Sequence, residues 1–131
     1  MKKLLLILIL LTPLNAFAEW EFVKKSKSGD SFYVNTDKIT KDNSYIYFWR
    51  LVDFSEPAFN DDLSAKTYAK ANCDSLEIHD LESYFYKEAM GKGNGKFLKP
   101  NIDQVIGWRS YPKNVIGETV LLFVCEERWL K

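Results

Sequence analysis

Apolar and polar positions alternate along much of the chain, and the longest alternating segment spans residues 44–54. Apolar side chains occupy both faces of this segment, with Tyr45, Tyr47, Trp49 and Leu51 on one face and Ile46, Phe48 and Val52 on the other. Two apolar faces are typical of a strand that is covered from both sides. We therefore predict a central strand here, with a helix over one of its faces.

Two shorter apolar segments precede the central strand. Residues 20–23 and residues 31–34 are rich in aromatic and β-branched side chains, and a polar segment with Gly29 near its end separates them. This pattern predicts a β-hairpin. The residues that follow, up to Asn43, are mostly polar, and we expect turns there around one apolar residue, Ile39.

Three further segments with strand-like patterns follow the central one. Residues 64–73 alternate small and polar side chains, and residues 107–109 are predicted to form a last short strand, which Pro112 ends. Residues 76–86 fit a strand with one bulge or, almost as well, a helix. The triplet Tyr84-Phe85-Tyr86 favours the strand, because aromatic residues are enriched in strands.

Near the C-terminus the apolar period changes from two residues to between three and four. This spacing is shown by Val115, Ile116, Val120, Leu121, Val124 and Cys125. It predicts a helix within residues 115–127, joined to the sheet through Cys125. Residues 90–100, in which glycines and lysines are interleaved, are predicted to form a loop.

The first eighteen residues have the layout of a secretory signal peptide. Two lysines precede an unbroken apolar run, residues 4–11, and Ala16-Phe17-Ala18 supplies the small residues that a signal peptidase requires. We predict cleavage between Ala18 and Glu19. The apolar run is shorter than the roughly twenty residues that cross a bilayer, so we expect no stable membrane anchor. No cysteine lies near the cleavage point, so the exported protein is not expected to be a lipoprotein.

Cleavage would leave residues 19–131, a length typical of one domain. The signal peptide holds two lysines and no acidic residue, so its removal takes the formal net charge from 0 to −2. A nearly neutral chain has no electrostatic preference for nucleic acid or for an anionic membrane, and we expect neither as a partner. We predict a periplasmic or secreted protein.

The only two cysteines, Cys73 and Cys125, both follow the predicted cleavage point. In an oxidising compartment such a pair is most simply a disulfide, and a bridge over this separation stabilises a fold by roughly 4 kcal/mol. Two alternatives remain open. The first is a redox pair, although such pairs normally have C-x-x-C spacing. The second is a zinc site, which would need two further ligands, and His79 is the one histidine present.

Residue patterns typical of catalysis do not appear in this chain. The single histidine, His79, adjoins Asp80, and neighbouring residues of a strand point to opposite faces. The segment 91–96 fits neither common phosphate-binding glycine motif, and the acidic residues of segment 53–62 lack the spacing of a calcium loop. We predict no catalytic residue, no cofactor and no metal, and hence no enzyme.

Lysines are concentrated near the glycine-rich loop, beside Tyr84 and Tyr86. They are Lys87, Lys92, Lys96 and Lys99. Basic and aromatic side chains together can bind polyanions, but lysines on a loop also serve solubility alone. The sequence leaves both interpretations open.

Taken in order, these features resemble the surface-adhesin protein E family of small bacterial envelope proteins. The resemblance rests on Trp20, the glycine turn, Phe32-Tyr33-Val34-Asn35, Ile39, Trp49-Arg50-Leu51-Val52-Asp53, Ser64-x-Lys66, Asn72-Cys73, Tyr84, Met90-Gly91-Lys92-Gly93, Trp108, Pro112 and Val124-Cys125. It covers nearly all of residues 19–131, and its motifs are structural ones.

The resemblance implies an α+β fold: a single antiparallel β-sheet of about five or six strands with a C-terminal α-helix packed on it, stapled by a Cys73–Cys125 bridge. It also implies an exported, non-catalytic module that binds host extracellular proteins and can pair as a homodimer. The best-known member of the family carries a lipid, whereas no lipid-bearing cysteine is found here. The alternative is therefore a soluble periplasmic accessory protein with a bacterial partner and no role in adhesion. The shared positions transfer no ligand-binding residue, so the ligand-binding residues stay unknown.

Overall fold

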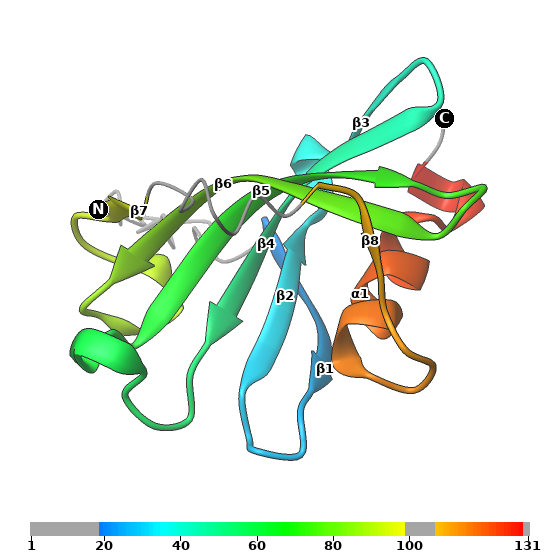
Figure 1. Ribbon diagram of the computed structural model, residues 1–131. Helices are drawn as coiled ribbons and strands as arrows, with labels where there is room; N and C mark the ends of the chain where they lie inside the picture. The colour runs from blue at the N-terminus through cyan, green and yellow to red at the C-terminus, as the bar shows by residue number, and fades with distance from the viewer. Residues whose placement is uncertain (1–18, 99–106, 130–131) are drawn as a thin grey trace, which may run out of the picture.

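The computed structural model describes residues 19–98 and 107–129. Six strands follow one another in an antiparallel sheet (Figure 1). They are β1 (Trp20–Lys25), β2 (Ser31–Asn35), β4 (Tyr45–Asp53), β5 (Ser64–Asn72), β6 (Glu77–Tyr86) and β7 (Lys96–Leu98). Two short strands complete the sheet: β3 (Thr40–Asp42) pairs with β4, and β8 (Arg109–Ser110) pairs with β6. The predicted single antiparallel sheet is confirmed.

The helix α1 (Ile116–Val124) packs on one face of the sheet, mainly against β1 and β2. Its apolar side is formed by Val120, Leu121 and Val124, all buried in the core. The sheet contributes the alternate buried residues Val34, Ile46, Phe48, Ala69, Ala71 and Ile78. The alternation in β4 and β5 therefore has a direct cause, because every second side chain is buried under the helix layer.

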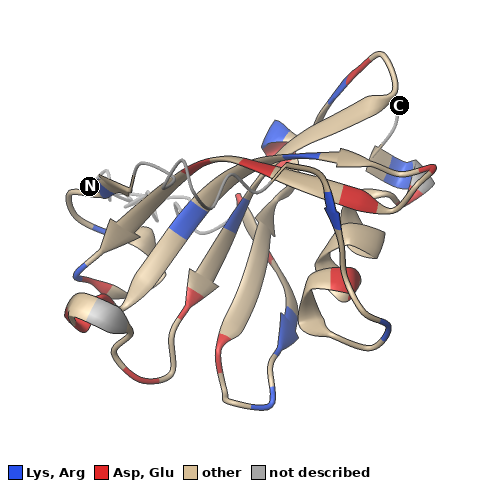
Figure 2. Ribbon diagram, viewed as in Figure 1, with Lys and Arg blue, Asp and Glu red and all other residues tan. Residues whose placement is uncertain are grey.

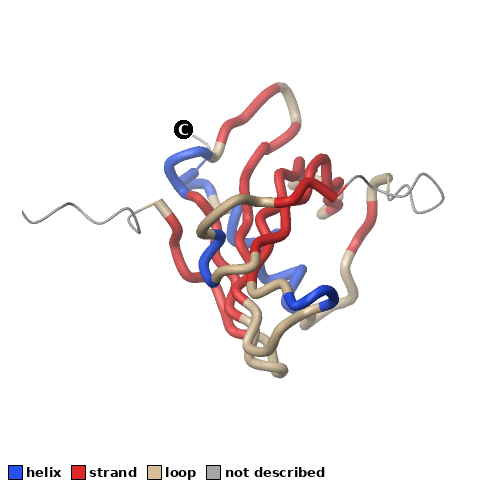
Figure 3. The backbone as a smooth tube through the Cα atoms, turned by 90° about the vertical axis from the view of Figure 1, so that its left-hand side faces the viewer, coloured by secondary structure: helices blue, strands red, loops and turns tan. Residues whose placement is uncertain are grey.

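A disulfide joins the end of the sheet to the end of the helix. Cys73 directly follows β5, Cys125 directly follows α1, and their Cα atoms lie 5.6 Å apart. The predicted bridge is confirmed, and the redox and zinc alternatives no longer apply to these residues. The chain continues from Cys125 into a 3₁₀ turn, Glu127–Trp129. Helical segments are few and short beside the strands (Figure 3).

The long strand predicted in residues 76–86 is β6, and it carries the one bulge that the pattern indicated. Tyr68 of β5 pairs with Glu82, but the next residue, Ala69, pairs with Asp80, so Leu81 is the extra residue. The bulge keeps His79 and Glu82 on the same face of the sheet. An uninterrupted strand would have placed them on opposite faces.

Three short segments differ from the predictions. Residues 96–98 were expected in a loop, but they form β7 because β6 supplies backbone partners for them. Residues 40–42 were expected in polar turns, but they pair with β4 as β3. The last strand begins at Arg109, not at Gly107. Strands this short carry too few residues for a recognisable period, and their pairing depends on a neighbouring strand.

Candidate functional site

The face of the sheet opposite α1, here called the open face, carries most of the aromatic side chains. Directly paired residues of neighbouring strands share a face, and the pair Trp49 and Tyr68 lies at its centre. The prediction that a helix covers one side of β4 is confirmed. Among the described residues, the open side of β4 is fully buried at Leu51, where the turn after β6 packs.

The rings of the open face form a continuous row across four strands. Trp49 stacks on Tyr68 with ring centroids 5.1 Å apart, and Tyr84 follows at 6.1 Å from Trp49. Phe97 on β7 lies 5.4 Å from Tyr84, and Tyr47 lies 6.1 Å from Tyr68. These distances are those of interacting aromatic pairs, so the row is a packed unit.

A second aromatic group lies at the β8 end of the open face. Tyr45 and Trp108 lie 5.1 Å apart, and His79 meets Trp108 edge to face at 5.8 Å. The ammonium of Lys70 lies 5.4 Å from the centroid of Tyr45 and 5.1 Å from that of Trp108. Lys70 therefore makes a cation–π contact with both rings.

At the other end, the open face is hollowed into a groove of about 380 Å³, here called the Trp20 groove. Its lining residues are Glu19, Trp20, Asn35, Lys38, Trp49, Lys66, Glu82, Tyr84 and Tyr86. The ammonium of Lys66 lies 5.6 Å from the centroid of Trp20 and 5.0 Å from that of Tyr86. The lining thus combines aromatic rings with two ammonium groups and two carboxylates.

The groove shifts the pKa values of three of its ionisable groups. Loss of solvation lowers the pKa of Lys66, with a further decrease from the positive charge of Lys38 and an opposing effect of Glu19. Loss of solvation also raises the pKa of Tyr84, and the carboxylate of Glu82, which accepts a hydrogen bond from the Tyr84 hydroxyl at 3.2 Å, raises it further. The pKa of Tyr86 is raised by burial. The raised pKa values favour the neutral form of both phenols in the groove.

A turn closes the open face beside this groove. The Ser64 hydroxyl donates to the carbonyl of Glu88 at 2.6 Å and accepts from the backbone N–H of Gly91 at 2.8 Å. The backbone N–H of Met90 donates to Asp53 at 2.7 Å. Gly91 has a φ of +65°, and a Cβ there would meet the side chain of Lys66. The start of the glycine-rich segment, which fits no phosphate-binding motif, is thus held as a cover for the sheet.

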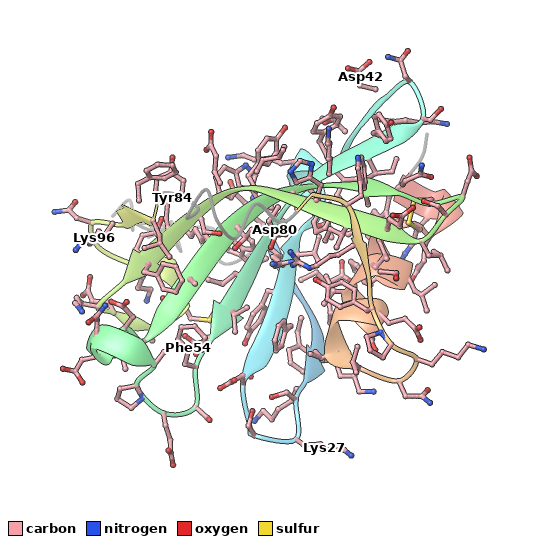
Figure 4. The ribbon with its side chains drawn as sticks, viewed as in Figure 1. Lys27, Asp42, Phe54, Asp80, Tyr84 and Lys96 are labelled. Carbon is pink, nitrogen blue, oxygen red and sulfur yellow. A yellow bond between two sulfur atoms is a disulfide. The ribbon has the colours of Figure 1, made fainter. Side chains whose placement is uncertain are left out.

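The polar cluster on the helix side of the sheet is structural. Asp80 accepts hydrogen bonds from Arg50 and Arg109, each at 2.8 Å, and Arg109 also donates to the Tyr111 hydroxyl at 3.1 Å. His79 lies on the open face, so this histidine and Asp80 are on opposite sides of β6, as strand alternation predicts. Figure 4 labels Asp80 and Tyr84 on these two sides. A shared catalytic role for His79 and Asp80 is not geometrically available.

The basic patch considered from the sequence is dispersed. Lys87 forms a 2.9 Å ion pair with Asp62 and donates to the backbone carbonyl of Asn60. Lys96 lines a separate hollow of about 350 Å³ with Phe85 and Leu98. Lys99 lies outside the described residues. Basic and acidic residues are interspersed over the strands and loops (Figure 2).

The acidic residues of segment 53–62 are likewise dispersed, with Asp53 and Asp62 bound to different partners. Within residues 19–98 and 107–129, no group of three or more side chains is arranged to hold a metal ion. In the same ranges, no helix has the length and apolar character that crossing a membrane requires.

Lys66 and Lys70 lie among the aromatic rings. The sequence identifies Lys66 only as part of a structural motif, and it assigns neither lysine to an aromatic face. The signal was present, because Lys66, Tyr68 and Lys70 occupy alternate positions of one predicted strand and therefore share a face. What the sequence could not supply was the register that places Trp49 beside Tyr68.

The comparisons with known proteins agree with this architecture. A family model described as surface-adhesin protein E matches residues 20–126. A crystal form II structure of Haemophilus influenzae protein E superposes with a TM-score of 0.67 at 16% identity, over 91% of this chain and 95% of that chain. A structure of protein E from non-typeable Haemophilus influenzae gives a TM-score of 0.60 at 18% identity, over 86% and 79% of the two chains. No curated protein matches the sequence.

Proposed function

The chain belongs to the surface-adhesin protein E family, and from this premise we propose that it is an exported, non-catalytic binding module of the cell envelope whose open face binds a protein partner. The partner expected first is a host extracellular protein, as for an adhesin. Export follows from the predicted signal peptide, residues 1–18, which lies outside the described residues. A disulfide-bonded domain is suited to an oxidising compartment.

The observation that carries the proposal is the row of aromatic rings on a face that α1 leaves uncovered. Phe97 and Trp108, at the two ends of the aromatic groups, are 48% and 37% exposed. Aromatic side chains are enriched in protein–protein interfaces and among the residues that dominate binding energy. The disulfide and the packed rings hold this face in one conformation, which reduces the entropy lost on binding.

The second candidate is a periplasmic accessory protein that binds a bacterial partner. It is supported by Ala16-Phe17-Ala18 followed directly by Glu19, without a cysteine to carry a lipid. The two candidates share the binding face and differ in the location of the protein.

Protease treatment of intact cells that express a C-terminally tagged chain separates the two candidates. Digestion on intact cells supports the adhesin, whereas protection until the outer membrane is opened supports the periplasmic protein. Retention of the chain in the cytoplasm would contradict both.

The binding face is tested with a Phe97→Ala/Trp108→Ala variant, and Leu122→Ala on α1 serves as the matched control because Leu122 is an exposed apolar residue on the opposite side. Proteins captured by the wild-type chain from host matrix or periplasmic extract are quantified for each variant. We expect the double variant to lose at least about tenfold in affinity and the control to be unchanged. Equal binding by all three chains would exclude the open face as the binding site.

A further inference from the structure

Asn35 lines the Trp20 groove, and its amide oxygen is unpaired among the described residues. The residue is 3% exposed, and its Oδ1 has no hydrogen-bond donor among the described residues. Buried polar atoms in folded proteins nearly always have a partner, because an unpaired one retains the cost of its lost hydration. A ligand that brings an O–H or N–H group into the groove would supply the missing donor.

The charges of the groove indicate a ligand without net charge. Lys38 and Lys66 contribute two ammonium groups, and Glu19 and Glu82 contribute two carboxylates. An anionic ligand would meet both carboxylates, and a cationic ligand would meet both ammonium groups. The ammonium of Lys66 also occupies the position between Trp20 and Tyr86 that a cationic ligand would take. The groove is therefore suited to a neutral ligand that both donates and accepts hydrogen bonds.

The shape of the groove adds a second requirement. Its volume of about 380 Å³ lies within the usual range for small-molecule sites. Trp20, Trp49, Tyr84 and Tyr86 form apolar walls. The groove crosses the face of the sheet from β1 to β6 and meets the edge strand β1 only at Trp20 and the preceding Glu19. An extended peptide lying in it would therefore not run alongside a row of free backbone groups. A ring with apolar C–H faces and hydroxyl groups at its rim meets both requirements.

We propose that the Trp20 groove binds a neutral saccharide. One sugar unit packs its C–H face on the aromatic walls, and its hydroxyl groups donate to Asn35 and Glu82 and accept from Lys66. This inference goes beyond the proposed function, because the ligand is a glycan and the site lies at one end of the open face.

The test is a titration of the ¹⁵N-labelled protein, purified after expression of the complete chain, with neutral oligosaccharides of glucose, galactose, mannose and N-acetylhexosamines. We expect saturable shifts of the Trp20 and Trp49 indole N–H signals with at least one member of this panel. Trp20→Ala should weaken binding by about tenfold or more, equivalent to about 1.4 kcal/mol. Leu122→Ala is the control, since Leu122 is an exposed apolar residue of α1 on the opposite side of the sheet, and the affinity of this variant should be unchanged.

Glu82→Gln provides a second variant whose effect does not depend on packing, because Glu82 is exposed. It should weaken binding while the rest of the spectrum stays unchanged. The proposal is overturned if no panel member shifts the groove signals at about 10 mM. This concentration exceeds the highest dissociation constant expected of a specific site. It is also overturned if only sulfated or carboxylated polysaccharides bind, or if a peptide shifts the groove signals and sugars do not. Equal effects of Trp20→Ala and Leu122→Ala would overturn it as well. Protein capture by the open face is measured separately, with Phe97 and Trp108, so failure of either proposal is distinguishable from failure of the other.

Discussion

Gly117, in the first turn of α1, lies directly against the ring of Tyr111, which leaves no space for a Cβ atom. Tyr111 in turn receives a hydrogen bond from Arg109, which binds Asp80 on β6. The start of the helix is thus seated on a side chain that is itself fixed to the sheet. Glycine is a poor helix former, but at this position it is favoured because it permits α1 to pack closely on Tyr111.

Gly117→Ala should destabilise the fold although alanine is the better helix former. The added methyl group forces Tyr111 or α1 to move, at a cost of about 1–3 kcal/mol, which exceeds the gain in propensity of up to about 1 kcal/mol. The midpoint of urea denaturation measures the difference. Leu122→Ala is the control on the same helix; Leu122 is 47% exposed, and we expect a change below about 1 kcal/mol. A Gly117→Ala protein more stable than wild type would show that the contact relaxes freely.

Asp80→Asn should destabilise the protein by about 2–3 kcal/mol, because it leaves two partly buried guanidinium groups without a counter-charge. Arg50 and Arg109 each lie 2.8 Å from the same carboxylate oxygen. Arg109→Gln should cost less, since Arg50 still neutralises Asp80. Thermal and urea unfolding of both variants measure this order, and the reverse order would contradict the cluster as described.

Replacing both cysteines should weaken the fold without changing its architecture. A Cys73→Ala/Cys125→Ala variant loses a bridge across 52 residues, for which we expect about 4 kcal/mol of lost stability. Because the bridge joins the end of α1 to the end of β5, amide exchange should increase most in α1. Urea denaturation measures the lost stability, and hydrogen exchange locates it. Both are compared with wild-type protein and with reduced wild-type protein. Uniform loss of protection across sheet and helix would show that the bridge supports the whole domain equally.

Tyr84 should ionise above the ordinary pKa of a tyrosine, which is about 10. The folded state favours the neutral phenol, so the unfolded state releases its proton first as the pH rises. Stability contributed by Tyr84 is therefore present below pH 10 and is lost as the pH rises from about 10 through the folded pKa. NMR of ring-labelled tyrosine measures the titration. In Glu82→Gln the pKa of Tyr84 should fall but stay above its ordinary value, since the loss of solvation remains; an unchanged pKa would exclude an effect of Glu82.

The sequence by itself determined the main elements, because their signals are local. Alternation along residues 44–54 and 64–73 marked β4 and β5, and the change of period after residue 115 marked α1. The same alternation separated His79 from Asp80. The two cysteines and the order of the motifs indicated the bridge and the family, both of which are confirmed.

Only the tertiary structure decided how the strands are aligned and which side chains meet. The strand β7 (Lys96–Leu98) exists because β6 pairs with it, and a three-residue strand has no period of its own. The register of β4 with β5 stacks Trp49 on Tyr68, and the bulge at Leu81 brings Glu82 to the same face as His79. The Trp20 groove joins residues from β1 to β6, so it depends on contacts between distant parts of the chain. Local patterns record which face a side chain occupies, but its neighbours on that face are set by strand register, which only packing of the whole sheet fixes.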